Sequence, residues 1–216
     1  MASAKIESVE LLGGRRARKR QRTSAMLAET AFDLFERDGF EGVTMEQIAT
    51  AADVSRGTLY NHFPVKEALL DHYFQAEFQA GIGSLVGDAN RRASLENQLI
   101  HLFDAFSAWA SRRRKYLPHC LDYGLKARGR LQAQPNSIAL RAVFTSLLAE
   151  AQKSGQIRPR VQVHALAEYL EFLYFAAILR WLASKDSSPR MECRRMLDLF
   201  LRGVQVQTQT SQKART

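Results

Sequence analysis

A run of twenty residues, TMEQIATAADVSRGTLYNHF at positions 44–63, limits most strongly what this chain can fold into. Thr44 and Gln47 have the spacing of a capping box, so Thr44 is expected to begin a helix. Residues 53–54 are predicted to form a tight turn, after which Ser55 is the expected N-cap of a second short helix. Two short helices joined by such a turn predict a helix-turn-helix, although an ordinary helical hairpin fits the same pattern.

The second helix of a helix-turn-helix lies in the major groove of DNA, with its N-terminal residues at the base edges. Leu59 and Phe63 are four residues apart and are expected to face inward, which turns the other residues of this helix outward. Arg56 lies in the first turn, from which it can reach a guanine, and Asn61 can pair with an adenine or contact a phosphate. Hydroxyl and imidazole groups suit phosphate oxygens. The candidate DNA contacts of this helix are Ser55, Arg56, Gly57, Thr58, Tyr60, Asn61 and His62.

The positive charge of the chain lies outside this motif. The net charge is +9 and the pI is near 9.9, a balance that favours a polyanionic partner. Residues 15–22, RRARKRQR, carry six positive charges and no acid, whereas residues 23–66 hold three Lys and Arg against seven Asp and Glu. We expect residues 1–22 to form a flexible basic arm. A solvated tail is the alternative, but the position ahead of the motif favours DNA contacts through Arg18, Arg20 and Arg22.

Helical spacing of apolar residues recurs along the rest of the chain, and no run of any length alternates as a strand would. Stripes of this kind begin near residues 27, 69, 94, 118, 138, 163 and 189. Gly39 and Gly155 are expected just beyond helix ends, and Ser188 is the expected N-cap of the last helix. The chain is therefore predicted to be all-α.

Several functional classes are disfavoured by what the sequence lacks. Cys120 and Cys193 have no metal-ligand spacing and fit a reducing cytosol. The N-terminus has no signal-peptide pattern, and the most apolar stretch, 169–183, is interrupted by Glu171 and Arg180 and is too short to span a bilayer. No catalytic triad, carboxylate pair or phosphate-binding loop is visible. We therefore expect a cytoplasmic protein that is not an enzyme, contacts no membrane and uses no metal or cofactor.

Residues 24–70, and above all IATAADVSRGTLYNHFPVKEALL, resemble the DNA-binding domain of the TetR family of transcriptional regulators. The resemblance implies about nine helices, of which the first three bind DNA, the middle ones enclose a ligand and the last two form a dimer interface. It also assigns roles to matching positions: phosphate contacts from helix N-termini to Thr44 and Lys66, DNA-backbone contacts to Tyr60 and His62, and base contacts to Arg56, Thr58 and Asn61.

Two positions depart from the family pattern. Asp53 stands where the family usually has glycine, and because Asp tolerates left-handed backbone better than most residues, the turn is expected to survive. Val65 stands where a capping serine or threonine is common, which weakens the prediction of where the fourth helix begins.

The resemblance divides the chain into a DNA-binding domain (23–67), a ligand-binding and dimerisation domain (68–205) and a disordered tail (206–216). Aromatic residues are more often simple core, but in this architecture the core and the ligand pocket coincide. The candidate ligand contacts are Phe78, Phe103, Phe106, Tyr123, Phe144, Phe172 and Phe175. A helix that is apolar nearly all round must be covered nearly all round, so the last two helices are predicted to pair across a dimer. The candidate dimer contacts are Tyr174, Trp181, Leu197, Phe200 and Leu201.

Together these features predict a ligand-responsive repressor. As a homodimer it would bind double-stranded, palindromic operator DNA, and a small, mostly apolar effector would release it. A regulator of the same fold that activates transcription, or that answers to a protein partner, has the same recognisable residues. An enzyme that uses the helical pocket is disfavoured, because no catalytic constellation is present.

Overall fold

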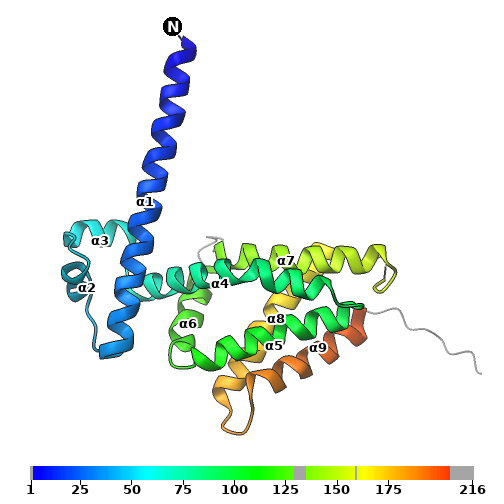
Figure 1. Ribbon diagram of the computed structural model, residues 1–216. Helices are drawn as coiled ribbons and strands as arrows, with labels where there is room; N and C mark the ends of the chain where they lie inside the picture. Colours follow the sequence, from blue (N-terminus) through cyan, green and yellow to red (C-terminus); the bar gives the residue numbers. More distant parts are fainter. Residues whose placement is uncertain (1, 129–134, 159, 205–216) are drawn as a thin grey trace, which may run out of the picture. The chain divides into compact units, whose positions relative to one another are not determined.

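The computed structural model describes residues 2–128, 135–158 and 160–204, and these residues form helices with no strand among them (Figure 1). The predicted all-α class is therefore confirmed. The predicted tail, 206–216, lies outside the described residues. The helices are α1 (Ala2–Asp38), α2 (Met45–Ala51), α3 (Arg56–His62), α4 (Lys66–Asn90), α5 (Leu95–Arg112), α6 (Leu117–Arg128), α7 (Pro135–Lys153), α8 (Val163–Ala183) and α9 (Pro189–Val204).

Helix α1 begins far earlier than the sequence pattern predicted. The helix runs from Ala2, so the stretch expected to be a flexible arm is helical and continuous with the folded part. The physical reason is local: Arg, Lys, Gln and Ala fill residues 15–22, and all four are strong helix formers. The helix ends where Gly39 adopts a left-handed backbone (φ 79°), as predicted.

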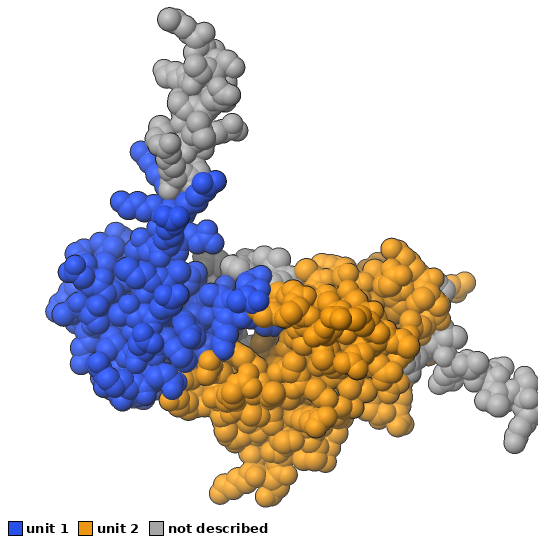
Figure 2. Space-filling view, viewed as in Figure 1, with its two compact units in different colours: residues 1–80, 119–126 blue, residues 81–118, 127–216 orange. Residues whose placement is uncertain are grey.

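The chain folds as two compact units, coloured separately in Figure 2. Unit 1 comprises Met1–Ala80 and His119–Lys126, and unit 2 comprises Gly81–Pro118 and Ala127–Thr216. The proposed domain boundary at 67–68 followed chain order, whereas the compact units divide within α4. Most of α6 belongs to unit 1, although it is far from α1–α3 in sequence.

Unit 1 places α2 and α3 on a core contributed by α1 and the start of α4. Leu27 and Phe35 of α1, Ile48 of α2 and Leu59 of α3 are fully buried. The ring of Phe32 on α1 stacks on Tyr73 of α4, with centroids 3.9 Å apart. Burial of these side chains fixes which face of α3 is turned outward.

Unit 2 is a set of packed helices in which α5 contacts α7 and α9, and α8 contacts α7 and α9. Phe103 of α5 lies against Phe144 of α7, with ring centroids 5.6 Å apart, and against Tyr174 of α8 at 5.4 Å. The fully buried carboxylate of Glu171 accepts hydrogen bonds from Arg141 (Nε 2.9 Å, Nη2 2.8 Å). Such a pair holds two helices in one register, because removing either partner would leave a buried charge uncompensated.

Candidate nucleic-acid interface

The two short helices of the motif are capped as the sequence predicted. The N–H of Gln47 donates to Thr44 Oγ1 (3.2 Å), and the side chain of Gln47 accepts from the N–H of Thr44 (2.7 Å), which completes the capping box. Asp53 adopts a left-handed backbone (φ 52°), so the turn survives without glycine. At the start of α3, Ser55 Oγ accepts from the N–H of Thr58 (3.1 Å).

Helix α3 turns one face to the core and one to solvent. Leu59 is fully buried and Phe63, the C-cap, is nearly so, as predicted. The side chains of Ser55, Arg56, Tyr60 and Asn61 are exposed, as is Gly57, and Thr58 is partly buried. A Cβ at Gly57 would meet no atom closer than 3.9 Å, so this glycine leaves open space on the outer face where a ligand backbone could approach closely.

Arg56 has one charged neighbour in the motif, which the sequence reasoning missed. Its Nη1 lies 3.8 Å from Glu46 Oε1 on α2, and the two side chains are 72% and 41% exposed. An ion pair this exposed contributes little, because water and salt screen it. Arg56 can therefore leave Glu46 for a base edge or a phosphate at small cost.

His62 and Lys66, both predicted DNA contacts, are engaged with the protein in this structure. His62 Nδ1 forms a hydrogen bond with Ser24 Oγ of α1 (2.9 Å), and burial, together with the charge of Arg20, lowers its pKa. Lys66 Nζ donates to the carbonyl of Phe40 (2.7 Å) and lies 4.7 Å from the centre of the Phe40 ring. A phosphate contact by the Lys66 ammonium would have to replace these interactions.

The exposed basic residues of α1 divide between two faces of the helix. Arg16, Arg18, Arg20 and Arg22 are all exposed. At about 100° per residue, Arg16 and Arg20 lie on the side of Ser24, which faces α3, and Arg18 and Arg22 lie on the opposite side. The prediction of contacts by Arg18, Arg20 and Arg22 rested on a flexible arm and therefore did not distinguish the two faces of a helix. The three predicted contacts stay predictions, and among them only Arg20 lies on the side of Ser24.

Phe40 joins three elements of unit 1 in a way that the sequence did not reveal. Beside the Lys66 contact, the Phe40 ring stacks on His119 of α6, with centroids 4.1 Å apart. His119 Nε2 also lies 3.7 Å from Glu41 Oε1. Sequence separations of this length carry no periodic signal, so only the fold brings these residues together.

The predicted ligand-binding residues fall in both units. In unit 2, Phe103, Phe106 and Phe144 are buried, and Phe175 is partly buried, whereas Phe172 is almost half exposed (46%). In unit 1, Phe78 and Tyr123 are partly buried. The structure therefore groups Phe103, Phe106 and Phe144 but does not gather all seven candidates within one unit.

Most of the predicted dimer contacts are buried within unit 2, and their assignment to a dimer interface stays a prediction. Trp181, Leu197, Phe200 and Leu201 are buried in their own chain, and Tyr174 packs on the rings of Phe103 and Phe106. The periodicity of an all-round apolar helix does not say which side its own chain covers. The exposed large apolar residues of the last two helices include Tyr169 (65%), Leu173 (38%), Leu179 (44%) and Leu199 (73%).

Comparison with known proteins agrees with this geometry. Residues 27–73 match the family described as bacterial regulatory proteins, tetR family. The HTH-type transcriptional repressor DhaR of Mycobacterium sp. (strain GP1) is 26% identical over 194 residues, which cover 81% of this chain and 86% of that protein. The HTH-type transcriptional regulator TcmR of Streptomyces glaucescens is 36% identical over 101 residues, 47% of this chain and 43% of that protein.

A solved structure extends the similarity to nearly the whole chain. FadR of Thermus thermophilus, a TetR family transcriptional repressor crystallised in complex with lauroyl-CoA, is 26% identical with a TM-score of 0.69. The match covers 88% of this chain and 100% of that chain.

The capped helix pair with its exposed second helix, together with the family match of residues 27–73, identifies the helix-turn-helix of a DNA-binding transcriptional regulator. Residues 27–73 match the TetR family, as the resemblance of residues 24–70 predicted, and most of the chain is similar to DhaR and to FadR of Thermus thermophilus. In the part of the chain that the structure describes, no helix is long and apolar enough to cross a bilayer.

Proposed function

We propose that the protein is a dimeric repressor whose two α3 helices bind a palindromic operator, and that a mostly apolar small molecule releases it. The observation that carries this proposal is the outward face of the capped α3, with Arg56 in its first turn. Two such helices in successive major grooves would lie about 34–36 Å apart. The repressor names of DhaR and of FadR from Thermus thermophilus favour repression over activation.

A reporter gene behind a selected operator tests the direction of regulation. We expect expression of the protein to lower transcription, and Arg56→Ala to restore it. Higher transcription in the presence of the protein would instead identify an activator.

The outer faces of α8 and α9 support the dimer. Tyr169 and Leu173 are four residues apart on α8 and therefore share a face, and Leu199 of α9 is the most exposed of the large apolar residues. Exposed apolar residues gathered on two neighbouring helices are typical of an interface. Pairing these faces with their symmetry mates would form a four-helix bundle.

Charge placed on that face tests the dimer. The double variant Leu173→Glu, Leu199→Glu should sediment as a monomer, because carboxylates would be buried in the interface. Val65→Glu is the matched control, since Val65 in unit 1 is as exposed (39%) as Leu173 (38%). A wild-type monomer at micromolar concentration, or a dimer that survives the double change, contradicts the proposal.

The aromatic cluster of unit 2 supports an apolar effector. Phe103, Phe144 and Tyr174 come from three different helices, and burial raises the pKa of the Tyr174 hydroxyl above its ordinary range. A ligand inserted among these helices would shift their packing, and ligand pockets are largely apolar with few polar groups. Because the Thermus FadR was crystallised with lauroyl-CoA, a long-chain acyl-CoA is the first candidate.

Operator binding with and without lauroyl-CoA tests this effector class. We expect lauroyl-CoA to weaken operator affinity by about 5–150-fold, which corresponds to the usual coupling of about 1–3 kcal/mol, whereas CoA alone should not. A compound that raises the melting temperature yet leaves operator affinity unchanged occupies the protein without acting as an effector.

A further inference from the structure

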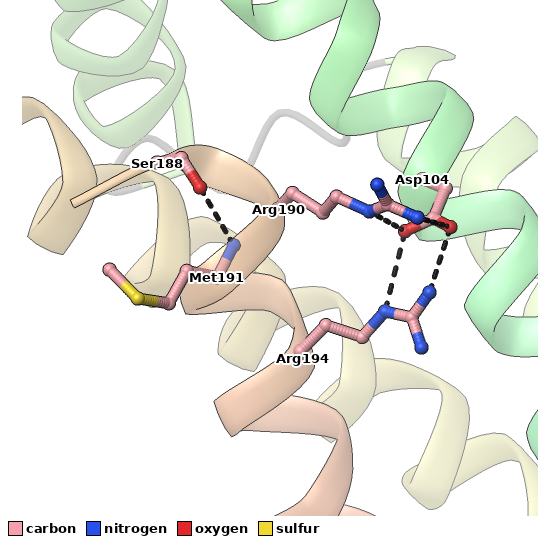
Figure 3. A network of polar contacts seen from close by, with 5 residues as sticks. All are labelled: Asp104, Ser188, Arg190, Met191 and Arg194. Atoms are coloured by element: carbon pink, nitrogen blue, oxygen red, sulfur yellow. Dashed lines mark hydrogen bonds and ion pairs between the residues drawn. The ribbon is translucent and has the colours of Figure 1, made fainter.

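Two arginines of α9 share one carboxylate of α5, far in sequence from the DNA-binding helices (Figure 3). Asp104 accepts hydrogen bonds from Arg190 (Nε 3.0 Å, Nη2 2.9 Å) and from Arg194 (Nε 3.4 Å, Nη2 2.8 Å). The two guanidinium groups carry two positive charges against one negative charge. The cluster therefore keeps a net positive charge and holds its two forks side by side.

Most of the hydrogen-bonding capacity of these arginines is left for another acceptor. A guanidinium has five N–H donors, and Asp104 uses two from each arginine, so three remain on each. Both carboxylate oxygens of Asp104 already accept two hydrogen bonds. The side chains of Arg190 and Arg194 are 65% and 41% exposed, so a solute can reach them.

The carboxylate that positions the forks stays ionised near neutral pH. Burial opposes ionisation of Asp104, but the hydrogen bonds and charges of Arg190 and Arg194 outweigh it and hold the pKa of Asp104 below its ordinary value. The hydrogen bond and charge of Asp104 in turn raise the pKa of Arg190. The ionised carboxylate therefore holds the two guanidinium groups in position in the folded protein at physiological pH.

The arginines line a surface depression of about 390 Å³ together with Ser188 and Met191. This volume lies within the range of small-molecule sites. Ser188 Oγ accepts a hydrogen bond from the backbone N–H of Met191 (3.1 Å), which caps α9. This N–H is therefore not available to a ligand. The donors offered to a ligand are those of the guanidinium groups, whereas the side chain of Met191 points away from them (Figure 3).

The two segments that carry Asp104 and the two arginines are rich in basic residues. Residues 104–116 and 180–195 hold nine Lys and Arg against three Asp and Glu. The two segments meet where the guanidinium of Arg114 lies 4.5 Å from the centre of the Trp181 ring. A concentration of one sign of charge around a depression attracts anions. DNA recognition by α3 does not account for this second basic region.

We propose that the arginine depression, formed by Ser188, Arg190, Met191 and Arg194 over Asp104, binds the diphosphate group of a small molecule. A guanidinium fork matches one phosphoryl group with two parallel hydrogen bonds. Two forks held on adjacent turns of one helix therefore match two linked phosphoryl groups. The inference does not rest on the proposed effector, because neither the aromatic cluster nor α3 takes part in it.

Calorimetric titration of the full chain with inorganic pyrophosphate and with ADP, both free of metal ions, tests the site. We expect both to bind at low salt. The double variant Arg190→Gln, Arg194→Gln should weaken binding by about tenfold or more, because charge-assisted hydrogen bonds are lost. Arg180→Gln, Arg195→Gln is the matched control: it removes the same two charges from the arginines that pair with Glu192 (3.0 Å each). Tighter binding of ADP would identify a nucleotide as the source, and equal binding would identify inorganic diphosphate.

Two further variants separate a binding site from a mere bridge between helices. Asp104→Asn keeps both arginines but removes the carboxylate that holds their forks side by side, so diphosphate should bind less tightly even though the net positive charge rises, whereas binding by charge alone would become tighter. Arg190→Lys keeps the charge but loses the fork, so binding should weaken while the protein stays folded by circular dichroism. The proposal is overturned if neither anion binds to the wild-type protein. It is also overturned if the heat of binding persists in the double variant. A folded Asp104→Asn protein that binds diphosphate as tightly as wild type, or more tightly, also overturns it.

Discussion

Removing basic residues from one face of α1 at a time provides a strict test of how the N-terminal helix contacts DNA. The double variant Arg16→Gln, Arg20→Gln changes the face shared with Ser24, which is hydrogen-bonded to His62 of α3. Arg18→Gln, Arg22→Gln removes the same charge from the opposite face. All four side chains are exposed, so neither variant should impair folding.

The expected magnitude follows from counterion release. Each phosphate contact that is lost should flatten the slope of log affinity against log salt by about 0.9. Two arginines in each of two subunits make up to four contacts, so the first variant should flatten the slope by about two to four units per dimer. The second variant should change the slope by less than about one unit, because its residues point away from the DNA that α3 binds.

Fluorescence anisotropy of a labelled operator, measured at several salt concentrations, gives both slopes. Unequal slopes of the predicted order would show that α1 lies on DNA as a helix with a defined face. Equal loss in the two variants would refute that geometry and favour a flexible arm. Slopes identical to wild type in both would show that these residues are only solvated.

The remaining predictions concern α3, the histidines of unit 1 and two glycines. Arg56→Ala should cost about 1–3 kcal/mol on the operator and relax sequence preference, whereas equal weakening on random DNA would make Arg56 a phosphate contact. Burial lowers the pKa of His62 and of His72 below 6.5. Their unfolded rings therefore take up protons more readily, and the melting temperature should fall as pH drops below about 6.5. The double variant His62→Gln, His72→Gln should reduce that fall, and an unchanged pH profile would contradict this origin. A Cβ at Gly42 would lie 2.8 Å from the Asp38 carbonyl oxygen, whereas one at Gly81 within α4 would meet nothing within 4 Å. Thermal unfolding should show Gly42→Ala destabilised by about 1–3 kcal/mol and Gly81→Ala stabilised by up to about 1 kcal/mol, and the reverse order would refute the backbone argument.

Features set by neighbours in sequence were predictable in this chain. The caps at Thr44 and Ser55 and the left-handed turn at Asp53 depend on residues within four positions of one another, and each forms as expected. The burial of Leu59 and Phe63 also followed from their spacing. These local features are sufficient to orient α3, whereas the DNA-binding class followed from the resemblance of residues 24–70.

Features set by distant contacts were not predictable. The contact of Lys66 with Phe40 joins residues 26 positions apart. It occupies the side-chain ammonium of a residue to which the resemblance had assigned a phosphate contact. On α8, the pattern could not tell the side buried in the chain's own core, with Trp181, from the outer side with Tyr169 and Leu173. The helicity of residues 15–22 was missed because charge without apolar residues suggested disorder, although the same residues favour a helix.

Selection of binding sites from random double-stranded DNA tests the central claim most directly. The protein should enrich an inverted repeat whose half-sites are centred about 10–10.5 base pairs, or a multiple of that, apart. The Arg56→Ala variant should lose information at symmetric positions in both half-sites, because one arginine from each subunit reads the same base. An enriched site without two-fold symmetry, or no enrichment over random DNA, would contradict a dimer that reads its operator through α3.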